Sequence, residues 1–278
     1  LHEVVKASIV GSIMGNILLV LGAAMFFGGL KRDRQFFDRT AASTQSSMLL
    51  LAAAALIMPA IYELVDGRGL PQPGAERVHY DSTVQGLSAA VACVLIFSYV
   101  AGLWFSLKTH RDLFNPESDD SEHGEPWTVR RSVIALCIAG IAVGVMSEIL
   151  VDSISEAASK LGLSEFFIGV IVVAIVGNAA EHWVAVLVAV KDKMDLAVNI
   201  AIGSSAQIAL FVAPVLVLTS FVLGPHPMAL VFNGFELGGI LLAIIIANHV
   251  TSEGESTWYE GLQLLAVYFV LGIAFLVA

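Results

Sequence analysis

The stretch KASIVGSIMGNILLVLG, residues 6–22, decides the fold because the chain carries a related stretch, VNIAIGSSAQIALFVAP, at residues 198–214. Gly11 aligns with Gly203 at an offset of 192 residues, and the serine after each glycine aligns at the same offset. A repeated stretch of this kind indicates two related halves, and it is considered before any local motif because it fixes the architecture.

Polar side chains lie inside both apolar stretches. Ser12 and Ser204 occupy aligned positions, and an amide follows in each copy, Asn16 in the first and Gln207 in the second. The two copies fall in the first and the sixth apolar segments of the chain, so they enter a membrane with opposite polarity. Inverted repeats with polar groups at mid-membrane depth are typical of secondary transporters.

Composition places the chain in a membrane. Of its residues 57% are hydrophobic and 14% are charged, and the mean hydropathy is +0.84, well outside the range of soluble domains. Long apolar runs exclude the alternating pattern of an outer-membrane barrel. The predicted fold is an all-α polytopic membrane protein, an inverted-repeat transporter bundle. Its eight transmembrane helices approach or exceed the roughly 20 residues that a crossing needs, and we place them at residues 8–28, 45–63, 83–107, 131–158, 165–190, 197–223, 229–249 and 258–278.

Basic residues set the orientation, because Lys and Arg are enriched in cytoplasmic loops. Ten of the fourteen fall on one side, which we assign to the cytoplasm: Lys31, Arg32, Arg34, Arg39, Lys108, Arg111, Arg130, Arg131, Lys191 and Lys193. The other side receives Lys6, Arg68, Arg77 and Lys160.

Neither cysteine is expected to form a disulfide, because Cys93 and Cys137 both fall inside predicted helices. The chain begins at Leu1 without a methionine or a signal peptide before the first apolar segment. We therefore expect that an N-terminal part of the protein precedes Leu1.

A polar segment, residues 108–130, separates the halves and carries ESDDSEHGEP. Two interpretations stay open. It is a solvated acidic connector, as most charge-rich runs are, or it senses cations through its acidic side chains: Glu117, Asp119, Asp120 and Glu122.

The stretch VVAIVGNAAEHWVAVLVAV, residues 172–190, carries the candidate chemistry. It is apolar enough to cross a membrane, yet Glu181 lies in its middle. A carboxylate at bilayer depth costs several kcal/mol, so a chain that keeps one there usually uses it.

Oxygen ligands surround this carboxylate in the predicted helix. Gly177 and Asn178 share a helical face with Glu181, and hard cations such as Ca²⁺ prefer carboxylate, amide and backbone oxygens. Gly177 would let a neighbouring helix or an opened backbone carbonyl come close. The predicted ligands of the cation and the proton also include polar residues of the two repeated stretches: Ser204, Ser205, Gln207, Ser12 and Asn16.

Helix packing is an alternative explanation for a serine or glycine in a membrane helix, but it does not require the charge of Glu181. His182 lies about 100° further around the helix. Three roles stay open for His182: pairing with a carboxylate, relaying protons, or closing a polar contact.

The motif GNAAEH, followed about twenty residues later by IGSSAQIALFVAPVLVL, resembles the second-half signature of the calcium/proton exchangers, the CAX branch of the calcium/cation antiporter superfamily. The stretches SIVGSIMGNILLVLG, SEILVDSISEAASKLGLSEFFIGVIVV and ANHVTSEGESTWYEGLQLLAVY are similar to other landmarks of that family, so the resemblance covers nearly the whole chain. Sodium/calcium exchangers of the same superfamily resemble the chain less.

The resemblance implies about eleven membrane helices, ten of them in two inverted five-helix repeats with one acidic motif in each. Residues 1–107 would then be the last three helices of the first repeat, residues 108–130 an acidic cytoplasmic linker, and residues 131–278 the second repeat. This chain contains one acidic motif. At the repeat offset its first-half partner falls before Leu1.

Other acids lie near predicted helix ends. Glu148, Asp152 and Glu156 repeat at four-residue spacing and form one stripe, which is either a cation exit funnel or a solvated helix end. Glu63, near the end of the second segment, is predicted to lie at the membrane interface.

Together these features predict a secondary active transporter that exchanges cytoplasmic Ca²⁺ for protons by alternating access. Glu181 would hold the cation and the proton in turn, so no cofactor is needed. Mn²⁺ and Cd²⁺ remain alternative cargoes, and a cation channel or a sodium/calcium-type exchanger could use the same ligands. An enzyme is not favoured because the chain has no H-E-x-x-H motif, and a basic footprint for nucleic acid is missing.

We expect the protein in the plasma membrane of a prokaryote, or in the vacuolar membrane if it is eukaryotic, with lipid around it. Association into a homo-oligomer stays open.

Overall fold

The computed structural model describes residues 2–73, 77, 79–110, 127–224 and 226–278. Within helix α6 it describes the backbone but not the side chains of residues 147–148, 151–152, 154–159 and 161.

The described chain is helical apart from short loops and two short strands, β1 (Gln35–Phe36) and β2 (Glu255–Ser256). The α-helices alternate in places with π-helical segments, which we label η. In chain order the helical segments are α1 (His2–Met14), η1 (Gly15–Val20), α2 (Leu21–Gly29), α3 (Arg39–Val65), α4 (Ser82–Trp104), η2 (Phe105–Thr109), α6 (Val129–Leu161), α7 (Glu165–Phe167), η4 (Ile168–Val173), α8 (Ala174–Gly177), α9 (Ala179–Val190), α10 (Met194–Gln207), η5 (Ile208–Val212), α11 (Ala213–Leu223), α12 (Gly234–Thr251) and α13 (Trp258–Val277).

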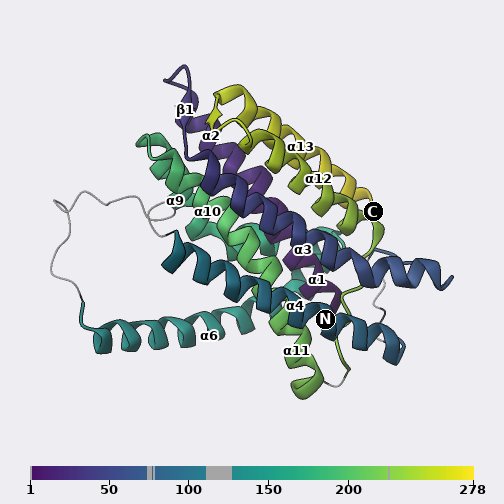
Figure 1. Cartoon of the computed structure of the whole chain (residues 1–278). Coiled ribbons are helices and arrows are strands. Elements are labelled where there is room, and N and C mark those ends of the chain that lie inside the picture. The colour runs from purple at the N-terminus through teal and green to yellow at the C-terminus, as the bar shows by residue number, and fades with distance from the viewer. Residues whose placement is uncertain (1, 74–76, 78, 111–126, 225) are drawn as a thin grey trace.

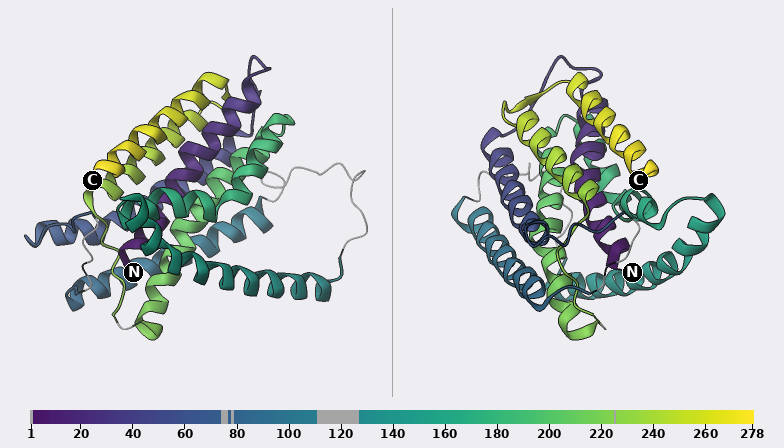
Figure 2. Two further views of the ribbon diagram at one scale, coloured as in Figure 1. Left: turned by 180° about the vertical axis from the view of Figure 1, so that it is seen from behind. Right: turned by 90° about the vertical axis from the view of Figure 1, so that its right-hand side faces the viewer.

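Seven helical stretches of the described residues are long and apolar enough to cross a membrane. An eighth crossing results if Glu165–Gly177 and Ala179–Val190, which meet at a bend of 57°, count as one span. The predicted polytopic bundle of eight spans is therefore confirmed. In Figures 1 and 2, α12 and α13 lie along one flank of the bundle and α9 and α10 along the other, with α1 and α2 between them.

The seventh predicted span begins too early. We placed its start at residue 229, but α12 begins at Gly234. Residues 229–232 are apolar, yet together with Asn233 they form a buried loop that packs against Ala60 and Val84. Helix formation starts only after Asn233, whose side chain accepts a hydrogen bond from the backbone N–H of Glu236 and so caps the helix.

The repeated sequence stretch builds the same backbone twice. The first copy is α1–η1–α2 and the second is α10–η5–α11. The helices α1 and α10 begin 192 residues apart, as do α2 and α11, and in both copies a π-helical segment interrupts the helix at matching positions. This agreement confirms the offset of 192 that the sequence predicts.

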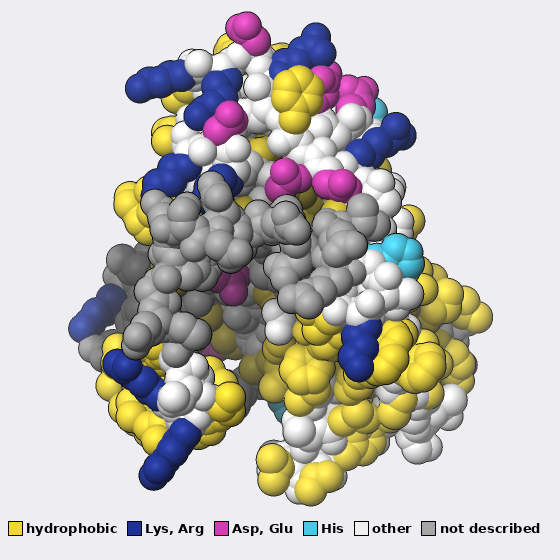
Figure 3. Space-filling model, turned by 60° about the vertical axis from the view of Figure 1, so that its left-hand side comes forward, with side chains coloured by type: hydrophobic (Ala, Val, Ile, Leu, Met, Phe, Trp, Pro, Cys, Tyr) yellow, Lys and Arg dark blue, Asp and Glu magenta, His cyan; other side chains and the backbone are white. Residues whose placement is uncertain are grey.

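Loops that we assign to one side of the membrane meet at one end of the bundle. β1 pairs with β2 in antiparallel fashion. The Arg32 guanidinium, in the loop before β1, forms an ion pair with Asp192 at 3.1 Å and donates to the carbonyl oxygen of Val190 at 3.1 Å. Charged side chains gather at this upper end in Figure 3. The structure thus brings together the loops that carry Arg32 and Lys191, as predicted, while the placement of Lys108, Arg130 and Arg131 on the same side and the compartment that this side faces stay predictions.

The core lies around the first copy. In the best membrane-spanning window of residues 2–29, 78% of the residues are buried. Gly11 lets α1 approach η4 closely, because a Cβ atom at this position would lie 1.8 Å from the carbonyl oxygen of Val170. The helix α6 instead runs along the outside of the bundle (Figure 2), and none of the window Val129–Met146 is buried.

Glu63, which we predicted to lie at the membrane interface, is fully buried by protein at the end of α3, and its depth in the membrane stays a prediction. Arg77, from the loop after α3, forms an ion pair with its carboxylate at 2.8 Å, and a second guanidinium, that of Arg68, lies 3.8 Å away. The loop folds back over the helix end because these arginines compensate the buried charge.

Both cysteines are free, as predicted.

Candidate functional site

The helix that carries the acidic motif is broken at the motif itself. α8 ends at Gly177, Asn178 has φ −105° and ψ 12°, and α9 starts at Ala179. Breaks of this kind at mid-membrane depth expose backbone carbonyls and helix ends that bind ions, and they are tolerated where they line a cavity or are covered by protein.

The break corrects our assumption of one continuous helical face. Gly177 and Glu181 belong to different helices, which meet at a bend of 57°. A Cβ atom at Gly177 would meet no described atom within 4 Å, so this glycine does not admit a neighbouring helix among the described residues. Asn178 and Glu181 stay one turn apart, because the carbonyl oxygen of Asn178 accepts from the N–H of His182 at 3.0 Å and opens α9.

Two amide–serine hydrogen bonds cross between the halves of the molecule. Asn178 donates from Nδ2 to the Ser12 hydroxyl at 3.0 Å. Asn16 donates from Nδ2 to the Ser204 hydroxyl at 2.9 Å. Four of the predicted site residues are thus brought together from α1, η1, α10 and the break before α9.

The hydrogen-bond network fixes which way each amide points. The Ser204 hydroxyl donates its single hydrogen to the carbonyl oxygen of Ile200 at 2.6 Å, so it accepts from the NH₂ group of Asn16. Asn178 also donates to the carbonyl oxygen of Ala174, at 3.1 Å, which only its NH₂ group can do. The amide oxygens of both asparagines are therefore left to act as ligands.

Asn16 shows this most clearly. Its side chain is 1% exposed, and its Oδ1 atom has no hydrogen-bond partner among the described residues. A buried amide oxygen without a partner is unfavourable unless something binds it. The oxygen suits a hard cation, which binds neutral amide oxygens along with carboxylates.

Ser205 occupies a different environment. It is fully buried, and its hydroxyl donates to the backbone carbonyls of Ala201 at 2.9 Å and Ile13 at 3.3 Å. Ile13 and Ser205 are 192 residues apart, the repeat offset, so the two copies touch each other at equivalent positions. Ser205 thus marks the pseudo-two-fold axis, and its role as a ligand stays a prediction.

Glu181 is exposed in the described structure, although we expected a buried carboxylate. It makes no hydrogen bond or ion pair with the described residues. It lies on the same stripe of α9 as Ala185 and Ala189, which are fully buried, so it extends the packed face of the helix. The chain bends just before this turn, and the described residues leave the Glu181 side chain uncovered.

Two other candidate site residues, the predicted ligand Gln207 and the possible proton relay His182, are placed less centrally. Gln207 is exposed, and its side chain makes no hydrogen bond with Asn16 or Asn178. His182 is half-buried, and its Nε2 atom has no hydrogen-bond partner among the described residues. The predicted funnel residues Glu148, Asp152 and Glu156 have side chains that lie outside the described part of α6. No group of three or more His, Cys, Asp or Glu side chains that could hold a metal ion occurs among the described residues.

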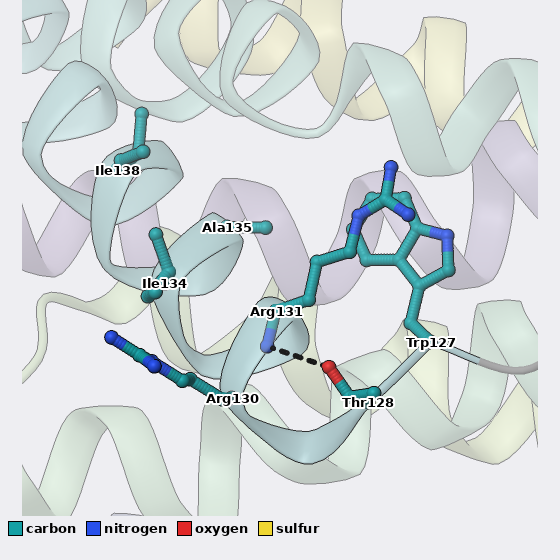
Figure 4. A pocket seen from close by; sticks show the side chains of 7 residues that line it. All are labelled: Trp127, Thr128, Arg130, Arg131, Ile134, Ala135 and Ile138. Atoms are coloured by element: carbon teal, nitrogen blue, oxygen red, sulfur yellow. Dashed lines mark hydrogen bonds between the residues drawn. The ribbon is translucent and has the colours of Figure 1, made fainter.

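A hollow of about 330 Å³ at the start of α6 does not belong to this site. Figure 4 shows that its lining comes from consecutive turns of one helix, with the Arg131 guanidinium stacked over the Trp127 ring at 4.4 Å. It contains no carboxylate and lies on the outside of the bundle, so the chemistry favours the break at Asn178 instead.

The two copies, the broken helix and the amide–serine hydrogen bonds between the halves are the features of a secondary transporter of the inverted-repeat class. Residues 2–108 and 131–277 match the model of the sodium/calcium exchanger protein family, and the chain belongs to that family.

Relatives within the family are close in sequence. The chain is 42% identical over 290 residues to the Ca²⁺/H⁺ antiporter of Aphanothece halophytica, with 99% of this chain and 74% of the relative covered. It is 41% identical over 279 residues to the Ca²⁺/H⁺ antiporter ChaA of Bacillus subtilis, with 99% and 76% covered. The solved structure of native YfkE superposes on it with a TM-score of 0.80 at 37% identity, covering all of this chain and 76% of that one.

Proposed function

We propose that this protein exchanges Ca²⁺ for protons across a membrane. The break at Asn178 is the observation that supports the proposal, because the helix opens there one turn before Glu181 and Asn178 donates to Ser12 of the first copy. The names of the relatives support the choice of Ca²⁺ and H⁺.

The chemistry of antiport follows from one carboxylate with two occupants. Glu181 binds Ca²⁺ as a carboxylate together with the amide oxygens of Asn16 and Asn178. A proton on the same carboxylate removes the charge that holds the cation, so the two occupants exclude each other. Rocking of the inverted copies about their contact then carries one occupant in each direction.

The accessible position of Glu181 suits one half of such a cycle. A site that exchanges its occupant with solution must be open on one side at a time. At the end of the bundle with β1 and β2, Gln35 donates to the carbonyl oxygen of Ala189 at 3.0 Å and ties the end of α9 down. We infer that this end is closed in the structure, and that the charge distribution makes it the cytoplasmic end.

The division of the chain follows from the same proposal. Residues 1–107 supply helices of the first repeat, residues 108–130 a linker, and residues 131–278 the second repeat. The membrane is the plasma membrane in a prokaryote.

Calcium uptake into everted membrane vesicles under an imposed pH gradient tests the exchange. We expect uptake in the wild type that a protonophore abolishes. Glu181→Gln should reduce uptake to background, because an amide cannot alternate between a charged and a protonated form. Glu253→Gln, in the exposed loop before β2, is the matched control and should transport normally.

Three outcomes would contradict the proposal. Uptake that persists with the protonophore and without any opposing gradient indicates a channel. Uptake driven by sodium but not by protons indicates a sodium-coupled exchanger. Normal exchange by Glu181→Gln removes this carboxylate from the site. Competition by Mn²⁺ and Cd²⁺ in the same vesicles measures cation selectivity.

A further inference from the structure

A second group of charges is buried at the opposite end of the bundle from β1 and β2. Lys6 of α1 is 1% exposed, although it is one of the most polar side chains of the protein. Its ammonium group forms an ion pair with Glu3, one turn earlier, and donates to the carbonyl oxygen of Val231 at 3.0 Å. Glu3 is itself only 6% exposed. This contact ties α1 to the buried loop before α12.

Glu236, in the first turn of α12, is a second buried carboxyl at this place. It is fully buried, and its Oε2 atom accepts from the N–H of Asn233 at 2.8 Å. Its Oε1 atom has no hydrogen-bond partner among the described residues. The side chain lies within electrostatic reach of Lys6 and Glu3.

The neighbouring charges are already balanced in another way. Glu63 of α3 pairs with Arg77, so it does not compete for Lys6. Tyr80 lies between the Glu63–Arg77 ion pair and Lys6. Its ring centre is 4.8 Å from the Arg77 guanidinium and 6.0 Å from the Lys6 ammonium. Burial raises the pKa of Tyr80, so its phenol stays neutral at physiological pH.

The formal charges of Glu3, Lys6 and Glu236 do not cancel. Glu3 and Glu236 bring two negative charges and Lys6 brings one positive charge. An uncompensated charge in a buried place is costly, and such groups bind a proton instead. Because Lys6 is engaged by Glu3 and Val231, the free Oε1 atom of Glu236 is where that proton fits.

We propose that Glu3, Lys6 and Glu236 form a second proton-binding site, separate from Glu181, in which one proton is held on Glu236 and Lys6 is the fixed counter-charge. Its relevance to transport rests on the proposed Ca²⁺/H⁺ exchange, but its existence does not. When the proton leaves, Glu236 competes with Glu3 and Val231 for Lys6. Proton occupancy therefore controls how α1, which carries Ser12, is tied to the loop before α12.

The chain offers a matched control in Glu260. Glu236 and Glu260 hold the same position in two capping boxes, at the starts of α12 and α13. The Oε2 atom of Glu260 accepts from the N–H of Thr257 at 2.7 Å, as that of Glu236 accepts from Asn233. Glu260 is only half-buried and lies at the other end of the bundle. A substitution of Glu260 therefore changes a capping residue of the same kind but leaves the buried charges at Glu3, Lys6 and Glu236 in place.

Infrared spectroscopy of the purified protein in detergent tests the proposal directly, because a protonated carboxyl has a C=O stretching band that shifts in D₂O. At neutral pH we expect the wild type to show such a band and Glu236→Gln to lose it. Glutamine can still cap the helix through its amide oxygen. Glu260→Gln should keep the band at wild-type intensity.

Lys6→Gln is a second variant, for which we expect a stronger C=O band instead of a weaker one. Without the ammonium group both carboxyls bind protons, so the intensity of the band should about double. This variant also covers the case in which Glu236→Gln does not fold. An unchanged band in either folded variant overturns the proposal.

Exchange in vesicles separates this inference from the proposed function. If wild-type vesicles lack proton-coupled Ca²⁺ uptake, the proposed exchange fails while the infrared result stands by itself. If wild-type vesicles exchange Ca²⁺ for protons but the Glu236→Gln variant keeps the infrared band of the wild type, the second proton site is wrong and the proposed exchange stands.

Discussion

The two copies of the repeated stretch have the same backbone but different surroundings. In their best membrane-spanning windows, 78% of the residues are buried in residues 2–29, against 33% in residues 194–223. The first copy is packed between α9, α12 and α13, whereas the second presents part of its surface to the outside of the described structure. Local sequence thus sets the helix and its π-helical interruption, and neighbouring elements decide which side chains can act.

The amides illustrate the difference. At the offset of 192, Gln207 aligns with Gly15 and not with Asn16. One residue corresponds to a rotation of about 100° around a helix. Asn16 therefore points into the contact with Ser204, while Gln207 points outward. The two amides look equivalent in the sequence, but in the structure Asn16 is buried and Gln207 is exposed.

The largest difference is expected between Gly11→Ala and Gly203→Ala. The new Cβ atom at Gly11 would lie 1.8 Å from the backbone oxygen of Val170, which cannot move without shifting η4. At Gly203 the nearest atoms belong to side chains, the Asn199 Oδ1 atom at 3.3 Å and the Gln45 Nε2 atom at 3.7 Å. Overpacking costs about 1–3 kcal/mol or more, so Gly11→Ala should strongly lower the thermal unfolding temperature in detergent. Equal unfolding temperatures for the two variants would show that the copies pack alike.

The next difference concerns Asn16→Leu and Gln207→Met, which keep side-chain volume and remove the amides. Loss of the buried amide at Asn16 should raise the Ca²⁺ concentration for half-maximal uptake about tenfold or more, because hydrogen bonds and contacts to charged groups contribute about 1.5–3 kcal/mol. Gln207→Met should change it less than about twofold. Uptake in everted vesicles measures both, and a larger effect at Gln207 would reverse the assignment.

Much of this architecture is predictable from the sequence. Apolar length gives the eight spans, and the repeat offset gives the inverted halves because helix starts and interruptions follow the same residues. The break at Asn178 is less visible, since Gly and Asn inside an apolar run also fit a continuous helix. No proline or charged residue at the break itself signals the interruption in the sequence.

Tertiary contacts explain the remaining misjudgements. The loop at residues 229–233 reads as helix because it is apolar, and it is apolar because it is buried against α3 and α4. The sequence also does not reveal the burial of Glu63 or its ion pair, because Arg77 reaches it from a loop whose path cannot be predicted. The orientation of Asn16 depends on Ser204, 188 residues away.

The smallest difference is expected between the two serines that hold the amides. In Ser204→Ala, the buried NH₂ group of Asn16 loses its hydrogen-bond acceptor, and its amide oxygen is no longer held in place. In Ser12→Ala, Asn178 keeps the carbonyl oxygen of Ala174 as an acceptor at 3.1 Å. An unsatisfied buried donor costs about 1–3 kcal/mol, part of which the amide recovers by rotating.

We therefore expect Ser204→Ala to raise the Ca²⁺ concentration for half-maximal uptake about three- to tenfold, and Ser12→Ala less than about twofold. Ser47→Ala is the control, because this exposed serine of α3 lies outside the predicted site and its hydroxyl donates to a backbone carbonyl, that of Ser43, at 2.8 Å. A purely structural role would lower the unfolding temperature of Ser204→Ala while leaving the Ca²⁺ dependence unchanged. Such a result would mean that Ser204 packs the helices and does not aim the amide of Asn16, and the difference between the two copies would then lie in packing alone.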